Sequence, residues 1–323
     1  MKTKKNTLLA IGEALIDFIP GQVGKPIKDV SSFHPVVGGA PANVCGAFVK
    51  LGGRARMITQ LGMDPFGDKI LEDFRRYGIG CEAVSRTEKA NTSLAFVALK
   101  EDGNREFSFY RKPGADMMLD PSRILPDWFD DGFGLHFCSV SLGDYPMKES
   151  HRKAISLAEK AGMLISFDPN LRRPLWNDDE ALKKAVLEFL PLADVLKLSD
   201  EELFFLTGCQ DIEEARPLLF QGRVQLIVYT EGAKGAFACT REACAQSPGI
   251  SVKAVDTTGA GDAFIGSFLY QLFSRGLDAK TLSTLSAREL ETMLDFSNRY
   301  CACSVQKEGA IASYPAAGDM QCP

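Results

Sequence analysis

Asp256-Thr257-Thr258-Gly259-Ala260-Gly261-Asp262 is the stretch from which the fold and chemistry of this chain are best inferred. It follows an apolar run, residues 250–255, that predicts a short strand, and it opens an apolar helix that continues from Ala263. A glycine-rich turn between a strand and a helix exposes backbone N–H groups at the positive end of the helix dipole. Because such a turn favours bound anions, the stretch predicts a phosphate site.

Asp262 permits two interpretations. A carboxylate in the first turn of a helix commonly caps the helix or balances its dipole. A carboxylate beside a phosphate site can also take the proton from a hydroxyl that attacks the phosphate. The stretch alone leaves both interpretations open, and the rest of the chain has to decide between them.

The composition is that of an ordinary globular protein, with 45% hydrophobic and 24% charged residues in 323. We expect residues 1–323 to form one large α/β domain with an excursion. The net charge of -5 argues against a nucleic-acid-binding surface. No apolar run reaches the length of a membrane span or a signal-peptide core. Nine scattered cysteines without metal-type spacing indicate small buried hydrophobes in a reducing cytoplasm.

Strand-like and helix-like segments alternate along most of the chain. This alternation predicts a mostly parallel central sheet covered by helices on both faces, a three-layer α/β/α fold. The first predicted strand, residues 7–12, is not followed by the G-x-G-x-x-G turn of dehydrogenases. Strands are predicted at 57–62, 135–140, 163–167, 195–198 and 226–229, and helices at 66–77, 147–161, 179–190 and 287–305.

Two segments interrupt the alternation. Residues 18–37 are rich in glycine and proline and have little helical pattern. Residues 92–99 and 105–111 are strand-like and flank Glu101-Asp102-Gly103-Asn104, which predicts a hairpin. We expect residues 18–37 and 91–116 to form a small antiparallel lid.

Polar residues follow several predicted strands, where open α/β sheets bind ligands. Asp17 follows the first strand, and Asp168, Asn170 and Arg172 follow the strand at 163–167. The turn from Thr230 to Gly235 follows the strand at 226–229 and suits backbone contacts to phosphate.

A helix start near the N-terminus adds further candidates. Gly38 and Gly39 let backbone approach a ligand closely, and Asn43 can bind neighbouring sugar hydroxyls. Each candidate has an ordinary alternative: a solvated turn for Asp17, a local cap for Asn43, a surface ion pair for Arg172, a plain hairpin for Thr230–Gly235, and a dipole partner for Glu202.

Three segments together resemble the ribokinase-like (PfkB-type) sugar kinases: residues 38–62, Asp168-Pro169-Asn170-Leu171-Arg172, and Asp256 through Phe264. The resemblance spans essentially the whole chain. Within that family, residues 107–117 and 167–172 are most similar to fructokinases. The resemblance implies a ribokinase-like fold and ATP-dependent phosphorylation of the terminal hydroxyl of fructose, which gives fructose 6-phosphate and ADP.

The resemblance also implies roles for individual residues. Asp262 is the expected catalytic base, the amides of Gly259, Ala260 and Gly261 form the anion hole, and Arg172 lies near the sugar and the γ-phosphate. The expected sugar-binding residues are Asp17, Gly38, Gly39, Asn43, Arg111 and Asn170. The nucleotide is expected beside Thr230, Gly232, Gly235, Gly259, Gly261 and Asn298, with the Gly309 turn on the adenine side.

Mg²⁺ is expected to bridge the ATP phosphates largely through waters, with Glu202 as a candidate ligand. Many family members carry Asn in an Asn-x-x-Glu motif where this chain has Ser199. Asp256 and Thr258 match the usual ligands of a monovalent cation such as K⁺.

Other functions remain open at this point. A 2-keto-3-deoxygluconate kinase would use similar Asp-x-Asn-x-Arg and Tyr-x-Arg segments, but needs cationic partners for a carboxylate. Ribokinase and a non-catalytic sugar- or nucleotide-binding protein are further alternatives. Exposed strand edges in the lid also favour a lid-to-lid homodimer.

Overall fold

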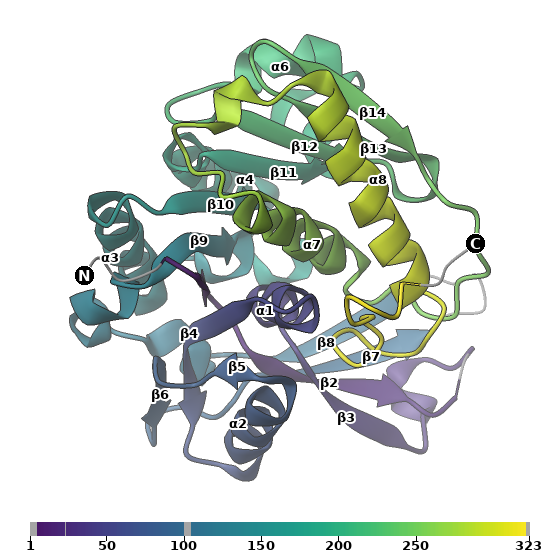
Figure 1. The fold of residues 1–323 in the computed structure, drawn as a ribbon. Coiled ribbons are helices and arrows are strands. Elements are labelled where there is room, and N and C mark those ends of the chain that lie inside the picture. Colours follow the sequence, from purple (N-terminus) through teal and green to yellow (C-terminus); the bar gives the residue numbers. More distant parts are fainter. Residues whose placement is uncertain (1–4, 23, 100–104, 321–323) are drawn as a thin grey trace.

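The computed structural model describes residues 5–22, 24–99 and 105–320, and it contains one large and one small sheet (Figure 1). The large sheet has the order β14-β13-β12-β11-β10-β9-β1-β4-β5, with β6 paired to β4. Pairing is parallel from β12 through β6, and β12, β13 and β14 form an antiparallel edge. Its strands are β1 (Thr7–Ile11), β4 (Arg54–Gly62), β5 (Ile79–Gly80), β6 (Val84–Thr87), β9 (Gly132–Cys138), β10 (Leu164–Asp168), β11 (Val195–Ser199), β12 (Leu226–Thr230), β13 (Gly235–Cys239) and β14 (Cys244–Pro248).

Helices cover both faces of this sheet because its strands are apolar on both sides. In β1, Leu8 and Ala10 belong to one core cluster, while Leu9 and Ile11 belong to the other. The first cluster is covered by α1 (Ala40–Lys50), α2 (Pro65–Tyr77), α7 (Ala260–Ser274) and α8 (Ala287–Ser304), and the second by α3 (Pro146–Lys160), α4 (Asp179–Phe189), α5 (Asp200–Thr207) and α6 (Ile212–Leu219). The predicted three-layer fold is confirmed.

The small sheet has the order β3-β2-β7-β8. Its strands are β2 (Leu15–Pro20), β3 (Phe33–Gly38), β7 (Leu94–Leu99) and β8 (Arg105–Tyr110). β2 and β7 are parallel, so the expectation of a wholly antiparallel lid is wrong. The reason is the long crossover from β3 through α1 and α2, which brings the chain back in the direction of β2. The predicted turn at residues 101–104 lies outside the described residues.

Aromatic side chains hold the small sheet on α2. Phe18 of β2 stacks on Phe96 of β7 at 4.5 Å between ring centroids, and its edge meets Phe66 of α2 at 5.6 Å. In Figure 1 the small sheet lies below α1, away from the antiparallel edge of the large sheet.

The strand predicted at residues 250–255 is not present. The segment is irregular and largely exposed, and the side chain of Val255 is 58% exposed. Extending this segment would bury little apolar surface, so it crosses from the sheet edge to α7 as a loop. The backbone N–H groups of Val255 and Asp256 both donate to the carbonyl oxygen of Val305.

The cysteines only partly match the expectation that they are small buried hydrophobic residues. Seven of them are free thiols, but Cys303 is disulfide-bonded and is therefore not a simple buried hydrophobe. Cys239 and Cys244 face each other across β13 and β14, and their sulfur atoms lie within 4.8 Å of a carboxylate oxygen of Glu213. Arg216 pairs with Glu213 at 2.7 Å, and this guanidinium opposes a metal cation there. Within the described ranges, none of the helices is long and apolar enough to cross a bilayer.

Candidate active site

The glycine-rich turn wraps tightly around the start of α7. Gly259 is the residue before the helix and has φ 72°, a left-handed conformation. A Cβ atom there would lie 2.5 Å from the hydroxyl of Tyr314, which donates a hydrogen bond of 2.8 Å to the Gly259 carbonyl oxygen. Glycine is therefore required here. The N–H of Ala260 donates to Thr257 O at 3.2 Å, so this amide closes the turn and is already occupied.

Asp256 organises the same turn from the other side. Its Oδ1 accepts from the backbone N–H of Thr258 at 2.9 Å and from the Thr258 hydroxyl at 2.6 Å. Its Oδ2 accepts from the N–H of Gly309 at 2.9 Å. The Gly309 turn therefore lies directly beside the glycine-rich turn.

Asp262 does not cap α7. It is only 5% exposed, and both of its carboxylate oxygens accept hydrogen bonds from side chains of other segments. Asn43 of α1 donates to Oδ2 at 2.8 Å, and Asn170, which follows β10, donates to Oδ1 at 3.0 Å. Burial raises the pKa of Asp262, while the two amides and the charges of Arg172 and Lys197 oppose this rise. A carboxylate fixed in this way and close to an anion site can act as a general base.

Arg172 is exposed at the rim of this group. Its Nη1 donates to the carbonyl oxygen of Leu171 at 3.0 Å. Its positive charge is close enough to lower the pKa of Asp262. Among the described residues Arg172 has no ion-pair partner, and the surface pair in this loop joins its neighbour Arg173 to Asp179.

Lys197 is a site residue that the sequence argument missed. It lies in β11, is buried, and its Nζ is 3.0 Å from Oδ2 of Asp168. A Cβ atom on Gly261 would lie 3.3 Å from the same Nζ, so the ammonium borders the first turn of α7. The available signal was a lysine inside the apolar run Val195-Leu196-Lys197-Leu198, because a buried strand admits a charge only when it is paired.

Carboxylates surround this ammonium. Burial lowers the pKa of Lys197, but Asp168, Glu202 and Asp262 outweigh that effect and raise it, so Lys197 stays cationic. Burial also raises the pKa of Asp168 to about 7, with Lys197 opposing. Three carboxylates face one ammonium, and when all are ionised the group carries two excess negative charges.

Glu202 both caps a helix and fastens the Arg172 loop. Its Oε2 accepts from the N–H of Ser199 at 2.7 Å, which completes a capping box at the start of α5. Its Oε1 accepts from the N–H of Leu171 at 3.0 Å. Both oxygens are thus bonded to backbone, which fits contact with Mg²⁺ through waters. The oxygen donors and excess negative charge of this group suit a divalent cation.

The glycines before α1 pack against protein atoms. A Cβ atom on Gly38 would lie 2.0 Å from Oδ2 of Asp17, and one on Gly39 would lie 2.5 Å from the carbonyl oxygen of Glu13. Gly39 also has φ 110°. The side chain of Asp17 therefore lies next to the backbone of Gly38, five residues before Asn43.

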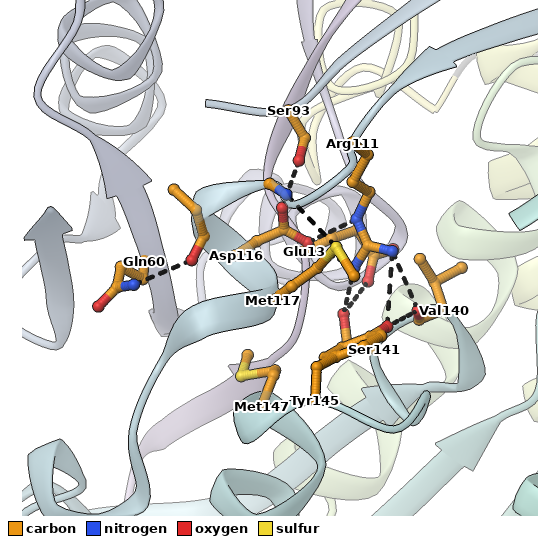
Figure 2. Close-up of polar contacts among 12 residues, drawn as sticks. Glu13, Gln60, Ser93, Arg111, Asp116, Met117, Val140, Ser141, Tyr145 and Met147 are labelled. Carbon is orange, nitrogen blue, oxygen red and sulfur yellow. Dashed lines mark hydrogen bonds and ion pairs between the residues drawn. The ribbon is translucent and has the colours of Figure 1, made fainter. Parts of the chain in front are cut away.

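Arg111 sits in a buried polar cluster at the base of the small sheet (Figure 2). Its Nε and Nη2 donate to Oδ2 of Asp116 at 2.8 and 2.5 Å. Glu13 belongs to the same cluster: its Oε2 accepts from the Ser141 hydroxyl at 3.1 Å, and its Oε1 accepts from the N–H of Ala40 at 3.2 Å. Burial raises the pKa of Glu13 to about 7, with Arg111 opposing. Asp116 and this role of Glu13 were not predicted.

Four of the expected nucleotide residues, Thr230, Gly232, Gly235 and Asn298, lie on the antiparallel side of the large sheet. Thr230 ends β12 and Gly235 begins β13, so the turn between them is part of a hairpin. Gly232 has φ 56°, and a Cβ atom there would meet open space. Asn298 of α8 donates through Nδ2 to Ser247 Oγ at 2.9 Å and to Pro248 O at 3.2 Å. Its amide thus fastens α8 to the end of β14.

Comparison with known proteins agrees with this geometry. The pfkB family carbohydrate kinase profile matches residues 5–317. The chain is 39% identical to the probable fructokinase-5 of Arabidopsis thaliana over 97% of this chain and 96% of that protein. It is likewise 39% identical to fructokinase-2 of Solanum lycopersicum over 97% of this chain and 94% of that protein.

Solved structures give the same result. A fructokinase with bound ATP from Xylella fastidiosa has a TM-score of 0.88 at 36% identity, covering 98% of this chain and 97% of that one. A fructokinase from Vibrio cholerae O395 with bound fructose, ADP and calcium ion has a TM-score of 0.84 at 34% identity, covering 96% of both chains. The chain therefore belongs to the pfkB family of carbohydrate kinases.

Proposed function

We propose that this protein transfers the γ-phosphoryl group of ATP to the terminal hydroxyl of D-fructose, giving fructose 6-phosphate and ADP. The observation that carries the proposal is Asp262, a buried carboxylate held by two carboxamides at the glycine-rich start of α7. The fructokinase relatives, and the related structures with ATP or with fructose and ADP, support the choice of nucleotide and sugar.

In this reaction Asp262 takes the proton from the attacking hydroxyl. Phosphoryl transfer needs positioning and charge stabilisation more than covalent chemistry. The amides of Asn43 and Asn170 hold both oxygens of Asp262 in one orientation, so little reorganisation is needed when the proton moves. Their donation also favours the ionised carboxylate, which is the form that acts as a base.

The opposite side of the reaction centre would bind the phosphoryl group. Because the N–H of Ala260 already donates to Thr257 O, the N–H groups of Gly259 and Gly261 and the positive end of the α7 dipole would bind this group, without the Ala260 amide that the resemblance implied. Lys197 adds a buried cation beside Gly261, and Arg172 adds an exposed one near Asp262. The charge of Arg172 would offset part of the negative charge that spreads over the phosphoryl oxygens, while Lys197 offsets the carboxylates around it.

The remaining predicted residues would bind the sugar at one end of the site and the nucleotide at the other. Asp17, Gly38, Gly39 and Asn43 would line the sugar end, where the small sheet would close over the sugar as a lid and exclude water. Thr230, Gly232, Gly235 and Asn298 would flank the nucleotide.

Two cations are part of the proposal. Mg²⁺ would be held through waters by Glu202, and when bound it would neutralise phosphate charge. A monovalent cation such as K⁺ would lie by Asp256 and Thr258, whose oxygens offer hard donors. The fructokinase from Vibrio cholerae O395 has been seen with bound calcium ion, and a double mutant of it with bound potassium ion.

The main rival is a 2-keto-3-deoxygluconate kinase. ADP release should be measured with ATP, Mg²⁺ and, in separate reactions, fructose, ribose, glucose or 2-keto-3-deoxygluconate. We expect the highest kcat/KM with fructose. Highest turnover on the keto-acid would overturn the sugar assignment, and binding without turnover of any sugar would favour a non-catalytic protein.

We also infer that the enzyme is cytoplasmic and that it forms a homodimer through the small sheet. β3 and β8 are the edge strands of that sheet, and Tyr110 on β8 is 64% exposed. Exposed strand edges readily pair with another copy. Sedimentation velocity would test the dimer, and a monomer at micromolar concentration would contradict it.

A further inference from the structure

The positive charge of Arg111 is already matched inside the protein. Its guanidinium donates through Nε and Nη2 to one oxygen of Asp116, and the two side chains are only 3% and 1% exposed. Its further contacts are longer and go to neutral oxygens, namely Val140 O and Ser141 Oγ, both at 3.4 Å, and the Tyr145 hydroxyl at 3.5 Å (Figure 2). The pair therefore brings hydrogen-bond donors but no net charge.

Direct contacts connect this pair to the proposed sugar end. The hydroxyl of Ser141, which meets Arg111, also donates to Glu13. Glu13 in turn accepts from the first N–H of α1, and Asn43 on the same helix holds Asp262. The charges of Glu13 and Asp262 are both close enough to the buried thiol of Cys138 to raise its pKa. A sugar beside Asp262 and Asn43 would thus lie close to Arg111.

The total charge of this cluster decides which substrates it tolerates. With Arg111, Asp116 and ionised Glu13 the sum is one negative charge, and with neutral Glu13 it is zero. A sugar acid whose carboxylate lies at this cluster would have to lose the hydration of that carboxylate, and the cluster has no net positive charge to replace it. A neutral sugar loses only hydrogen bonds, which the cluster and nearby amides can replace.

We propose that Asp116 determines substrate charge: by neutralising Arg111, it makes the site accept neutral sugars and reject sugar acids. The inference rests on the proposed kinase function and narrows its substrate class. Asp116 acts through Arg111 and is a positioning residue in this scheme. Specificity then arises from an unfavourable interaction with the wrong substrate as well as from contacts with the right one.

The test is Asp116→Asn, which removes the charge and keeps the shape. The amide oxygen can still accept from Arg111, and the amide N–H₂ can donate to Ser93 Oγ, which contacts Asp116 in the wild type. kcat and KM should be measured for fructose and for 2-keto-3-deoxygluconate, together with inhibition of fructose turnover by gluconate. We expect the fructose-to-keto-acid ratio of kcat/KM to fall by about tenfold or more, since removing a like charge relieves repulsion of the carboxylate. The inhibition constant of gluconate should fall.

Two further variants control for side effects. Asp194→Asn removes a buried carboxylate that pairs with Arg223 at the opposite, amino end of β11, and it should leave the ratio unchanged. The double variant Arg111→Gln with Asp116→Asn should lose the gain, because the cation that Asp116→Asn leaves unneutralised is gone. A gain in Asp194→Asn, or one that persists in the double variant, would contradict the proposal.

The outcomes separate the two proposals. If the wild type prefers the keto-acid, the fructokinase function fails. If the wild type prefers fructose and folded Asp116→Asn keeps the same ratio, only the role of Asp116 fails. Asp116→Ser serves if the asparagine variant does not fold, and if neither variant folds the pair is structural and the inference is overturned.

Discussion

Asn43 donates a hydrogen bond of 2.8 Å to Oδ2 of Asp262, across 219 residues of sequence. The two residues lie in the first turns of α1 and α7. The contact excludes a capping role for Asp262 and gives its carboxylate a fixed direction. A glycine precedes each helix for a separate reason: a Cβ atom would meet Glu13 O at Gly39 and the Tyr314 hydroxyl at Gly259.

Asp262→Asn should lower kcat by at least ~10²-fold, the low end of general-base effects. The amide keeps the shape of the side chain, so the thermal unfolding midpoint should change little. Asp68→Asn is the matched control, because Asp68 is also a carboxylate in the first turn of a helix but is exposed and pairs with Arg86. Normal turnover by a folded Asp262→Asn enzyme would show that another group is the base.

Asn170→Gly should shift the acid limb of the kcat/KM profile to higher pH. Asn170 donates to the ionised form of Asp262, so removing it raises the pKa of Asp262 further above its ordinary value. A shift of about 0.5–1 pH unit is expected from the loss of one hydrogen bond. Glycine suits this position because the backbone has φ 43°. An acid limb that stays in place or moves to lower pH would contradict the assigned contact.

Lys197→Met should destabilise the fold strongly, because it leaves three carboxylates around one site without their cation. We expect the free energy of unfolding at pH 7 to fall by about 3–5 kcal/mol, as for other broken buried pairs. The loss should be smaller at pH 5, where Asp168 with its pKa of about 7 becomes neutral. Urea unfolding of the wild type and the variant at pH 7 and pH 5 measures this loss in the free energy of unfolding.

Lys69→Met is the control for Lys197→Met. Lys69 is partly exposed and pairs with Asp73 at 3.1 Å, and Asp73 also pairs with Arg76. The variant therefore leaves this carboxylate with a cation, and we expect a loss of about 0–1 kcal/mol. Equal stability of the two variants would mean that the buried ammonium does not hold the carboxylates together.

Gly259→Ala should reduce both stability and kcat. Alanine costs about 1–2 kcal/mol in a left-handed conformation, and here its Cβ would also meet the Tyr314 hydroxyl and the Ala310 side chain. Gly208→Ala separates the two effects, since Gly208 has φ 77° but a Cβ there meets no atom within 4 Å. Gly259→Ala should lower both the unfolding temperature, measured by differential scanning calorimetry, and kcat clearly more than Gly208→Ala does. Similar values for the two variants would argue against close packing of the turn.

Local sequence predicted much of the fold. Alternating strands and helices predicted the layers, and the apolar run at residues 226–229 predicted a strand that the structure contains as β12. Local sequence failed at residues 250–255, where an apolar run has no surface to cover, and at β2 and β7, whose relative direction depends on the crossover between them.

The sequence by itself determined the glycine turns and the family, because φ preferences and motif spacing are properties of neighbouring residues. Only the tertiary structure decided which charges meet. The elements that meet are far apart in the sequence: Lys197 pairs with Asp168, and Asp262 accepts from Asn43 and Asn170. These pairings depend on how separate strands and helices pack. Even Arg111 and Asp116, five residues apart, form their pair because the base of the small sheet buries them together.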